Sequence, residues 1–247
     1  GFGGYASFPT MVAACFGTYR TIIHEQNAIL GRSNRFLAAH VDHIATSFQS
    51  TDAIPKRSNR NLLCTGMPVR KFEKNKKEIE YSIFNEKRKL KILVLGGSQG
   101  AKIFSAVVPE AIKKLENGFR SRIEVVQQCR SEDIEGVRKF YKKIKVKAQL
   151  RIFFNDVLKK IQESHLIICR SGASTIAELT SIGRPSILIP YPYSVDEHQM
   201  KNAMALDDCG AGWLIPEQSF TSDALSKKLE SFIKLPKTLA KAAGCAK

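Results

Sequence analysis

Residues 164–202, SHLIICRSGASTIAELTSIGRPSILIPYPYSVDEHQMKN, contain the pattern that decides the fold. Residues 165–169 form a short apolar run typical of a buried strand, and residues 170–174 form a turn of small residues. The sequence then predicts a helix over 175–182, which a Gly-Arg-Pro sequence ends, and a second buried strand over 186–189. Strand, turn, helix and strand in this order indicate an α/β fold with parallel strands.

The turn at 170–174 combines with polar residues downstream of it to suggest a binding site. A small-residue turn that opens a helix leaves backbone N–H groups and the positive end of the helix dipole open to an anion. Glu178 has acceptor oxygens suited to a vicinal diol, and His198 and Gln199 follow in a polar loop. This combination is typical of a nucleotide-sugar site. The alternative is an ordinary strand-to-helix turn, most of which bind nothing.

The alternation of strand and helix extends through the rest of the chain. Further strands are predicted over 21–23, 41–45, 62–64, 91–95, 123–127 and 150–153. Further helices are predicted over a segment that ends at Phe16 and over 28–39, 102–115 and 133–143. Short strands rich in Val, Ile and Leu, joined by helices, predict two Rossmann-like, doubly wound parallel-sheet domains. The charged segment 71–89, without helix caps, marks the boundary between them.

Several separate motifs carry a resemblance to one family. They are GFGGYASFP at 1–9, HEQNAILGRSNR at 24–35, TGMPVR at 65–70, LVLGGSQGA at 93–101, CRSGASTIAEL at 169–179 and DEHQMKNA at 196–203. In this order, from Gly1 to about Leu229, the chain resembles the MurG family of peptidoglycan N-acetylglucosaminyltransferases.

The resemblance implies the two-domain glycosyltransferase architecture called GT-B, with ligand beyond the carboxyl ends of the strands. We expect the remnant of an acceptor and membrane-side domain over 1–68, a linker over 69–90, a UDP-sugar donor domain over 91–230 and a tail over 231–247. Family members carry a strand and a glycine-rich loop before GFGGY. We therefore expect the chain to be N-terminally truncated and its first domain incomplete.

The resemblance also assigns a donor site to particular residues. Ser98 in the GGSQGA turn and Arg70 are matched to the donor diphosphate, for which a hydroxyl and a bidentate guanidinium are suited. The backbone of Phe154 is matched to uracil, and Glu178 is matched to the ribose. Ala173, Ser174 and Thr175 form the turn before Glu178. Gln199 and Asn27 are matched to the transferred sugar. From the residues alone, the favoured interpretation of Arg70 is a linker arginine that makes surface salt bridges, and Asn27 is alternatively a helix-capping residue. Met67 stands where the family usually has Asn.

His24 and Glu25 are the acid–base candidates in the first domain, and either is alternatively a loop residue without a catalytic role. The acceptor-side histidine that the family favours lies in the upstream loop. No D-x-D triplet occurs in the sequence, so we expect no metal ion and no cofactor. Helix N-termini and Arg70 would supply the positive charge at the diphosphate instead.

The chain is strongly basic, with 39 Lys and Arg against 23 Asp and Glu, a net charge of +16. This surplus fits an anionic partner or a solvated basic surface. Because no helix-turn-helix, zinc-finger or RNA-binding aromatic motif accompanies it, we expect no nucleic acid. The six cysteines lack CxxC spacing and favour free thiols. We expect peripheral binding to an anionic membrane surface, on the cytoplasmic face of the bacterial cell membrane.

The function implied by the resemblance is transfer of N-acetylglucosamine from UDP-N-acetylglucosamine to undecaprenyl-linked N-acetylmuramoyl-pentapeptide, lipid I, with inversion and without metal. The alternatives are a nucleotide-sugar binding module that needs a partner for its acceptor half, or an inactive remnant. A sugar epimerase of the same fold is a more distant alternative, which the HEQN and GFGGY motifs do not favour.

Overall fold

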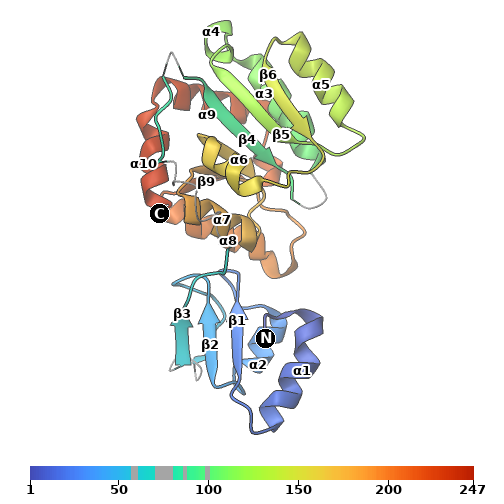
Figure 1. The fold of residues 1–247 in the computed structure, drawn as a ribbon, viewed down its shortest axis with the longest axis vertical. Coiled ribbons are helices and arrows are strands. Elements are labelled where there is room, and N and C mark those ends of the chain that lie inside the picture. The colour runs from blue at the N-terminus through green and yellow to red at the C-terminus, as the bar shows by residue number, and fades with distance from the viewer. Residues whose placement is uncertain (57–60, 70–79, 86–87, 98–100) are drawn as a thin grey trace.

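The computed structural model describes residues 1–56, 61–69, 80–85, 88–97 and 101–247 of the 247-residue chain (Figure 1). Within these residues the strands form two separate sheets, and every pairing between neighbouring strands is parallel. The predicted class, α/β with two parallel sheets, is confirmed.

The first sheet belongs to the N-terminal domain and has the order β1-β2-β3 among the described strands. Its elements are α1 (Gly4–Phe16), β1 (Ile22–Glu25), α2 (Arg32–Leu37), β2 (His43–Thr46) and β3 (Leu62–Cys64). Its small core packs Met11 of α1 and Leu37 of α2 against Ile23 and Ile44 of the sheet.

The second sheet has the order β6-β5-β4-β7-β8-β9 among the described strands. The strands are β4 (Leu90–Leu95), β5 (Ile123–Gln128), β6 (Lys147–Arg151), β7 (Leu166–Cys169), β8 (Ser186–Leu188) and β9 (Gly212–Leu214). Counted from β4, this is the 3-2-1-4-5-6 order of the Rossmann fold, which reverses between β4 and β7. Ligands of open α/β sheets bind at such a reversal, beyond the carboxyl ends of the strands.

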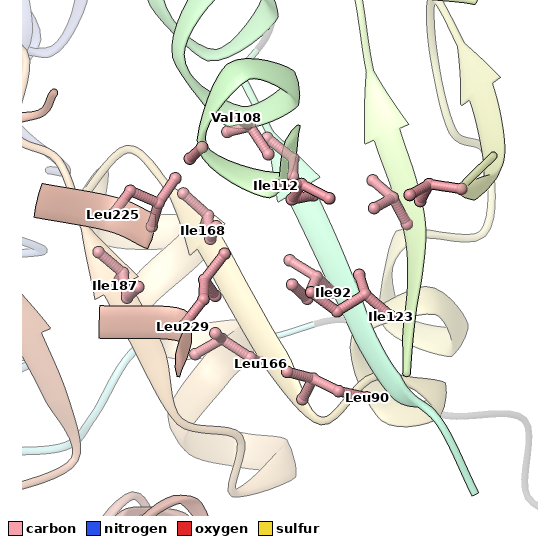
Figure 2. Close-up of a cluster of buried hydrophobic side chains, with 14 of the residues drawn as sticks. Leu90, Ile92, Val108, Ile112, Ile123, Leu166, Ile168, Ile187, Leu225 and Leu229 are labelled. Carbon is pink, nitrogen blue, oxygen red and sulfur yellow. The ribbon is translucent and has the colours of Figure 1, made fainter. Parts of the chain in front are cut away.

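Helices cover both faces of this second sheet. They are α3 (Lys102–Lys114), α4 (Asn117–Arg120), α5 (Ile134–Lys143), α6 (Val157–Glu163), α7 (Ala173–Ile182), α8 (His198–Asp208), α9 (Ser222–Lys234) and α10 (Lys237–Cys245). Side chains alternate across a strand, so Ile92 of β4 faces the α3 and α9 side while Leu93 faces the α6 and α7 side. Figure 2 shows the cluster on the α3 and α9 side, in which Val108 and Ile112 of α3 belong to the same core as Ile92 of β4.

The observed elements differ from the predicted ones in several places, one of which is that His198 and Gln199, expected in a polar loop, are the first residues of α8. The helix predicted over 28–39 is shorter and begins at Arg32. The strand predicted over 150–153 lies earlier, at Lys147–Arg151. Residues 231–247, expected as a tail, form the end of α9 and the whole of α10, and Leu239 is fully buried in the core.

Part of the expected linker at 69–90 also packs on the second domain. Phe84 is buried in its core, and the Tyr81 hydroxyl donates to the carbonyl oxygen of His165 at 3.1 Å. The Arg184 guanidinium lies over the Tyr81 ring at 5.6 Å. These contacts fix residues 80–85 to the start of β7.

Candidate functional site

The turn after β4 reaches the point where the strand order reverses. Gly97 has φ +82°, a backbone conformation that a residue with a Cβ adopts at a cost. Gln128, at the end of β5, accepts from Gly96 N at 3.1 Å and donates to the carbonyl oxygen of Gly97 at 3.0 Å. Its Nε2 also donates to Ile152 O, so one buried amide ties together the turns after β4 and β6. Ser98, the predicted diphosphate ligand in this turn, lies outside the described residues.

The turn after β7 leads directly into α7. Gly172 stands at the N-cap, and among the described residues no side chain accepts a hydrogen bond from the first turn of this helix. The N–H groups of Ala173, Ser174 and Thr175 have no partner within a helix of this geometry. The buried Ser171 hydroxyl donates to Gln199 O at 2.7 Å, which holds the turn against the start of α8. The α7 N-terminus is therefore a set of N–H donors on a fixed backbone, suited to an anion.

Arg170 organises the neighbouring loops. Its guanidinium donates to the carbonyl oxygens of Ile189 and Pro190 at 3.1 and 3.2 Å and pairs with Glu217 at 2.5 Å. It also lies 5.4 Å from the ring centre of Tyr191. The loop after β8 is thereby fixed beside the α7 N-terminus.

The loop after β8 contains two consecutive residues in the left-handed region, Asp196 (φ +48°) and Glu197 (φ +55°). Non-glycine residues adopt this conformation at a cost, and it occurs preferentially where a site requires it. Arg32 of the N-terminal domain donates to both carboxylate oxygens of Asp196, with a shortest distance of 2.9 Å. This hydrogen-bonded guanidinium lowers the pKa of Asp196. The strained loop is thus attached to the first domain.

Gln199, the predicted sugar ligand, follows this loop as the second residue of α8. Its Oε1 accepts from Tyr191 N at 3.0 Å, which closes the loop after β8. The same residue therefore shapes the loop that faces the first domain.

Glu25, at the end of β1, is a buried carboxylate that receives N–H donors on both oxygens. Oε1 accepts from Gln26 N, Asn27 N and Asn27 Nδ2, each at 3.0 Å. Oε2 accepts from Gly31 N at 2.9 Å and Asn34 Nδ2 at 2.8 Å. A carboxylate surrounded in this way holds the loop 26–31 in place and is poorly available as a base.

His24 is likewise occupied on both ring nitrogens. Nε2 lies 2.9 Å from the carbonyl oxygen of Gly66, so it carries the hydrogen. Nδ1 lies 3.2 Å from Gln26 Nε2 and accepts from it. This arrangement connects β1 to the segment after β3 and favours a structural role for His24.

A cavity of about 400 Å³ lies between the two domains beside the loop 26–31. Gly3 and Gly4, both with positive φ, line it at the start of α1, opposite Val195. Asn34 Oδ1 and His198 Nε2 are buried atoms of its lining that have no hydrogen-bond partner among the described residues. The cavity therefore offers a helix N-terminus and unpaired polar atoms to a polar ligand.

The remaining predicted residues are distributed around the same junction. Phe154 buries its side chain in the core after β6, which leaves its backbone for recognition. Glu178 lies half-buried on α7. Asn27 is not a helix cap, because α2 begins at Arg32 with Gly31 at its N-cap. Arg70 lies outside the described residues.

Three residues of the site escaped prediction: Gln128, Asn34 and Asn202. Each is a buried amide that binds backbone or side-chain atoms from another segment. Their signal in the sequence is a polar residue at a position that the neighbouring apolar pattern would bury, which indicates a buried hydrogen bond without naming its partner.

Two features are absent from the described residues. These residues contain no group of three or more His, Cys, Asp or Glu side chains placed to hold a metal ion. Within the same part of the chain, no helix has the length and apolar character needed to cross a membrane.

Two parallel α/β domains, with polar loops of both at the carboxyl ends of their strands, form the architecture of the GT-B class. The model of the glycosyltransferase family 28 C-terminal domain matches residues 91–247, and that of the family 28 N-terminal domain matches residues 1–46. The chain belongs to glycosyltransferase family 28.

Similar proteins agree with this assignment. A protein of Paramagnetospirillum magneticum, named UDP-N-acetylglucosamine–N-acetylmuramyl-(pentapeptide) pyrophosphoryl-undecaprenol N-acetylglucosamine transferase, is 48% identical over all of this chain and 67% of its own length. A protein of the same name from Rhodospirillum rubrum is 44% identical over all of this chain and 63% of its own length. The chain thus spans about two thirds of the length of these curated relatives.

Among solved structures, Acinetobacter baumannii MurG superimposes with a TM-score of 0.83 at 28% identity, over all of this chain and 68% of that one. The resemblance to the MurG family is confirmed. A UDP-N-acetylglucosamine 2-epimerase from Listeria monocytogenes, at 12% identity and a TM-score of 0.64, covering 99% of this chain and 67% of its own, shares the fold.

Proposed function

We propose that the protein containing this chain transfers N-acetylglucosamine from UDP-N-acetylglucosamine to undecaprenyl-pyrophosphoryl-N-acetylmuramoyl-pentapeptide, giving lipid II. The names of the relatives that match the whole chain support this substrate pair. The observation that carries the proposal is one of placement. The loop after β8 and helix α8 of the second domain bind α2 and the loop 26–31 of the first domain, and the turns after β4 and β7 lie at the carboxyl ends of neighbouring strands in the second sheet.

In this proposal the donor binds to the second domain. The N–H groups at the start of α7 and that of Gly97 bind the diphosphate, and Arg70 and Ser98 add to them. Glu178 binds the ribose diol, and the backbone at Phe154 binds uracil. These donors stabilise the negative charge that develops on the leaving diphosphate during a single inverting displacement at the anomeric carbon.

The first domain presents the acceptor side. Because the Glu25 oxygens and the His24 nitrogens are all engaged within the protein, we propose that these two residues position the loop 26–31 and transfer no proton. Asn27 belongs to the first domain and Gln199 to the second, and in this proposal both contact the transferred sugar from the two sides of the cleft.

A transfer assay tests the activity. A chain extended to the full length of the relatives is incubated with radiolabelled UDP-N-acetylglucosamine and lipid-linked acceptor, beside residues 1–247 alone. We expect turnover by the extended chain, unchanged in EDTA, and little or none by residues 1–247. An extended chain that needs manganese, or that leaves lipid I unmodified, would contradict the proposal.

We further propose that the first domain binds an anionic membrane surface peripherally, on the cytoplasmic face. Large apolar side chains are exposed on and after α1 and α2, with Phe16 88%, Tyr19 74% and Phe36 60% exposed. Arg20 and Arg35 are exposed nearby in the sequence. Apolar side chains flanked by cations fit the boundary between acyl chains and anionic headgroups.

Vesicle sedimentation tests this membrane surface. The double change Phe16→Ser, Phe36→Ser should reduce binding to vesicles of phosphatidylglycerol, with little change in unfolding temperature because both rings are exposed. The matched control is Phe153→Ser, which changes an exposed ring on the second domain. Equal loss in both variants would refute the assignment of the surface.

A second candidate function is donor binding alone. It is favoured by the fact that all the donor loops described above belong to the second domain. This second function predicts that residues 1–247 bind the nucleotide sugar and that the extended chain shows no turnover in the transfer assay.

A further inference from the structure

Asn202 is fully buried and belongs to α8, the helix of the second domain that Figure 1 shows next to the first domain. Its Nδ2 donates to Asn27 Oδ1 at 3.1 Å and to the carbonyl oxygen of Ser171 at 3.0 Å. Its Oδ1 accepts from Ala28 N at 2.8 Å. One side chain of the second domain therefore binds the turn before α7 and two residues of the first domain.

The direction of these hydrogen bonds is fixed from one end of the network. The Glu25 carboxylate only accepts, so Asn27 must turn its Nδ2 toward Glu25 and its Oδ1 toward Asn202. Asn202 must then present Nδ2 to Asn27, which leaves its Oδ1 for Ala28 N. The opposite orientation of Asn202 would place its Oδ1 against two acceptor oxygens, Asn27 Oδ1 and Ser171 O, and its Nδ2 against the donor Ala28 N. Asparagine is thus required here by both shape and polarity.

Two ion pairs also join the domains, and both are more exposed. Arg32, 77% exposed, pairs with Asp196, and Lys201 pairs with Asp52 at 2.7 Å with side chains 35% and 50% exposed. Solvent and salt weaken exposed pairs, whereas a buried hydrogen bond that is broken leaves polar groups without partners. Among these described links, the buried amide constrains the junction most.

We propose that Asn202 is a positioning residue that locks the angle between the two domains. Through Ser171 it fixes the turn before α7, and through Asn27 and Ala28 it fixes the loop 26–31. It thereby aligns the two sides of the cleft without itself contacting substrate. The link to catalysis rests on the proposed function, but the locked angle does not.

Domain orientation in residues 1–247 is the direct test. Residual dipolar couplings of backbone N–H groups in β1–β3 and in β4–β9 report how the two sheets are oriented. In Asn202→Ala we expect the alignment of the two sheets to become independent, and exchange of the Ala28 amide hydrogen to increase at least tenfold. Asp196→Asn, the matched control, removes one exposed pair and should leave both readouts unchanged.

The second test measures UDP binding and transfer activity. In the extended chain, Asn202→Ala should leave the Kd for UDP within twofold and lower kcat by about 100-fold, because small misalignments of reacting groups are costly. Asn202→Asp, which keeps the acceptor for Ala28 N, should behave alike because its carboxylate opposes two acceptor oxygens. A wild-type chain without transfer activity would refute the proposed function and leave the orientation test intact.

Two outcomes would overturn the proposal. One is a single common alignment of both sheets in Asn202→Ala, as in Asp196→Asn. Another is a loss of UDP binding that parallels the loss of kcat in both Asn202 variants. That second result would show that Asn202 supports the fold of the second domain in general.

Discussion

Buried amides and carboxylates determine the backbone around the cleft. Glu25 receives five N–H groups, and Gln128 connects two turns, so loops without regular structure acquire fixed shapes. At this scale the hydrogen-bond partners decide whether a polar residue serves the fold or the chemistry. Glu25 and His24 have their acceptor atoms engaged, whereas the first-turn N–H groups of α7 receive no side-chain cap from Gly172.

Glu25→Gln tests the structural role of this carboxylate. The new amide NH₂ would face at least two N–H donors, so we expect a loss of unfolding free energy of about 1–3 kcal/mol, measured by urea denaturation. Glu135→Gln, which removes an exposed pair with Arg138, is the control and should cost under about 0.5 kcal/mol. A stable Glu25→Gln protein that has lost only kcat would instead identify Glu25 as a base.

Glu178→Ala tests the proposed ribose contact. Loss of charge-assisted hydrogen bonds to the diol should weaken UDP binding by about 1.5–3 kcal/mol per bond at most. Calorimetric titration with UDP and with 2′-deoxy-UDP separates this effect from a general one, since the deoxy ligand should lose much less. Equal losses for both ligands would assign Glu178 to the fold of α7.

At the scale of elements, local pattern predicted the strands well and the loops poorly. The run 164–202 predicted β7, α7 and β8 to within two residues, because buried parallel strands and Gly-ended helices have strong local signals. The helix predicted from residue 28 begins at Arg32 because Ala28 N bonds to Asn202 and Leu30 N bonds to Asp52 O. These partners lie far away in the sequence, so no local pattern reveals them.

The same limit applies to the candidate site. The Gly-rich turns and the helix N-terminus were predictable, because they depend on residues next to each other in the sequence. The hydrogen bonds that Glu25 receives and the bridge through Asn202 depend on contacts between separate segments. They could not be predicted from the sequence. The assignment of individual donor ligands, such as Glu178 and Gln199, remains a prediction.

A histidine at the junction between β4 and β7 should make the free energy of unfolding depend on pH. His165, just before β7, accepts from Lys91 N through Nδ1 at 2.9 Å. Burial, with the nearby charges of Arg88, Lys91 and Arg184, lowers the pKa of His165 to about 4. The unfolded chain binds this proton near pH 6.5, so the stabilising contribution is complete above pH 6.5 and is lost as the pH falls toward 4.

His165→Asn isolates this contribution, because its Oδ1 can still accept from Lys91 N. Between pH 7 and pH 4.5 the wild type should lose about 1–2 kcal/mol more unfolding free energy than the variant, in urea titrations at both pH values. Parallel losses in the two proteins would show that His165 is not the group responsible.

At the scale of the whole molecule, the second domain forms a complete Rossmann-ordered sheet, while the first contributes a three-stranded sheet among the described residues. Family 28 models match both parts. The central claim is that the second domain carries the donor site at the reversal between β4 and β7, and that this site does not depend on acceptor chemistry.

Calorimetric titration of residues 1–247 with UDP-N-acetylglucosamine, and separately with UDP, tests this claim most directly. The account predicts saturable binding of both ligands at one site per chain, in buffer that contains EDTA. A cooperative thermal unfolding transition would establish that the sample is folded. The absence of binding heat over a range of temperatures from such a sample would contradict the account.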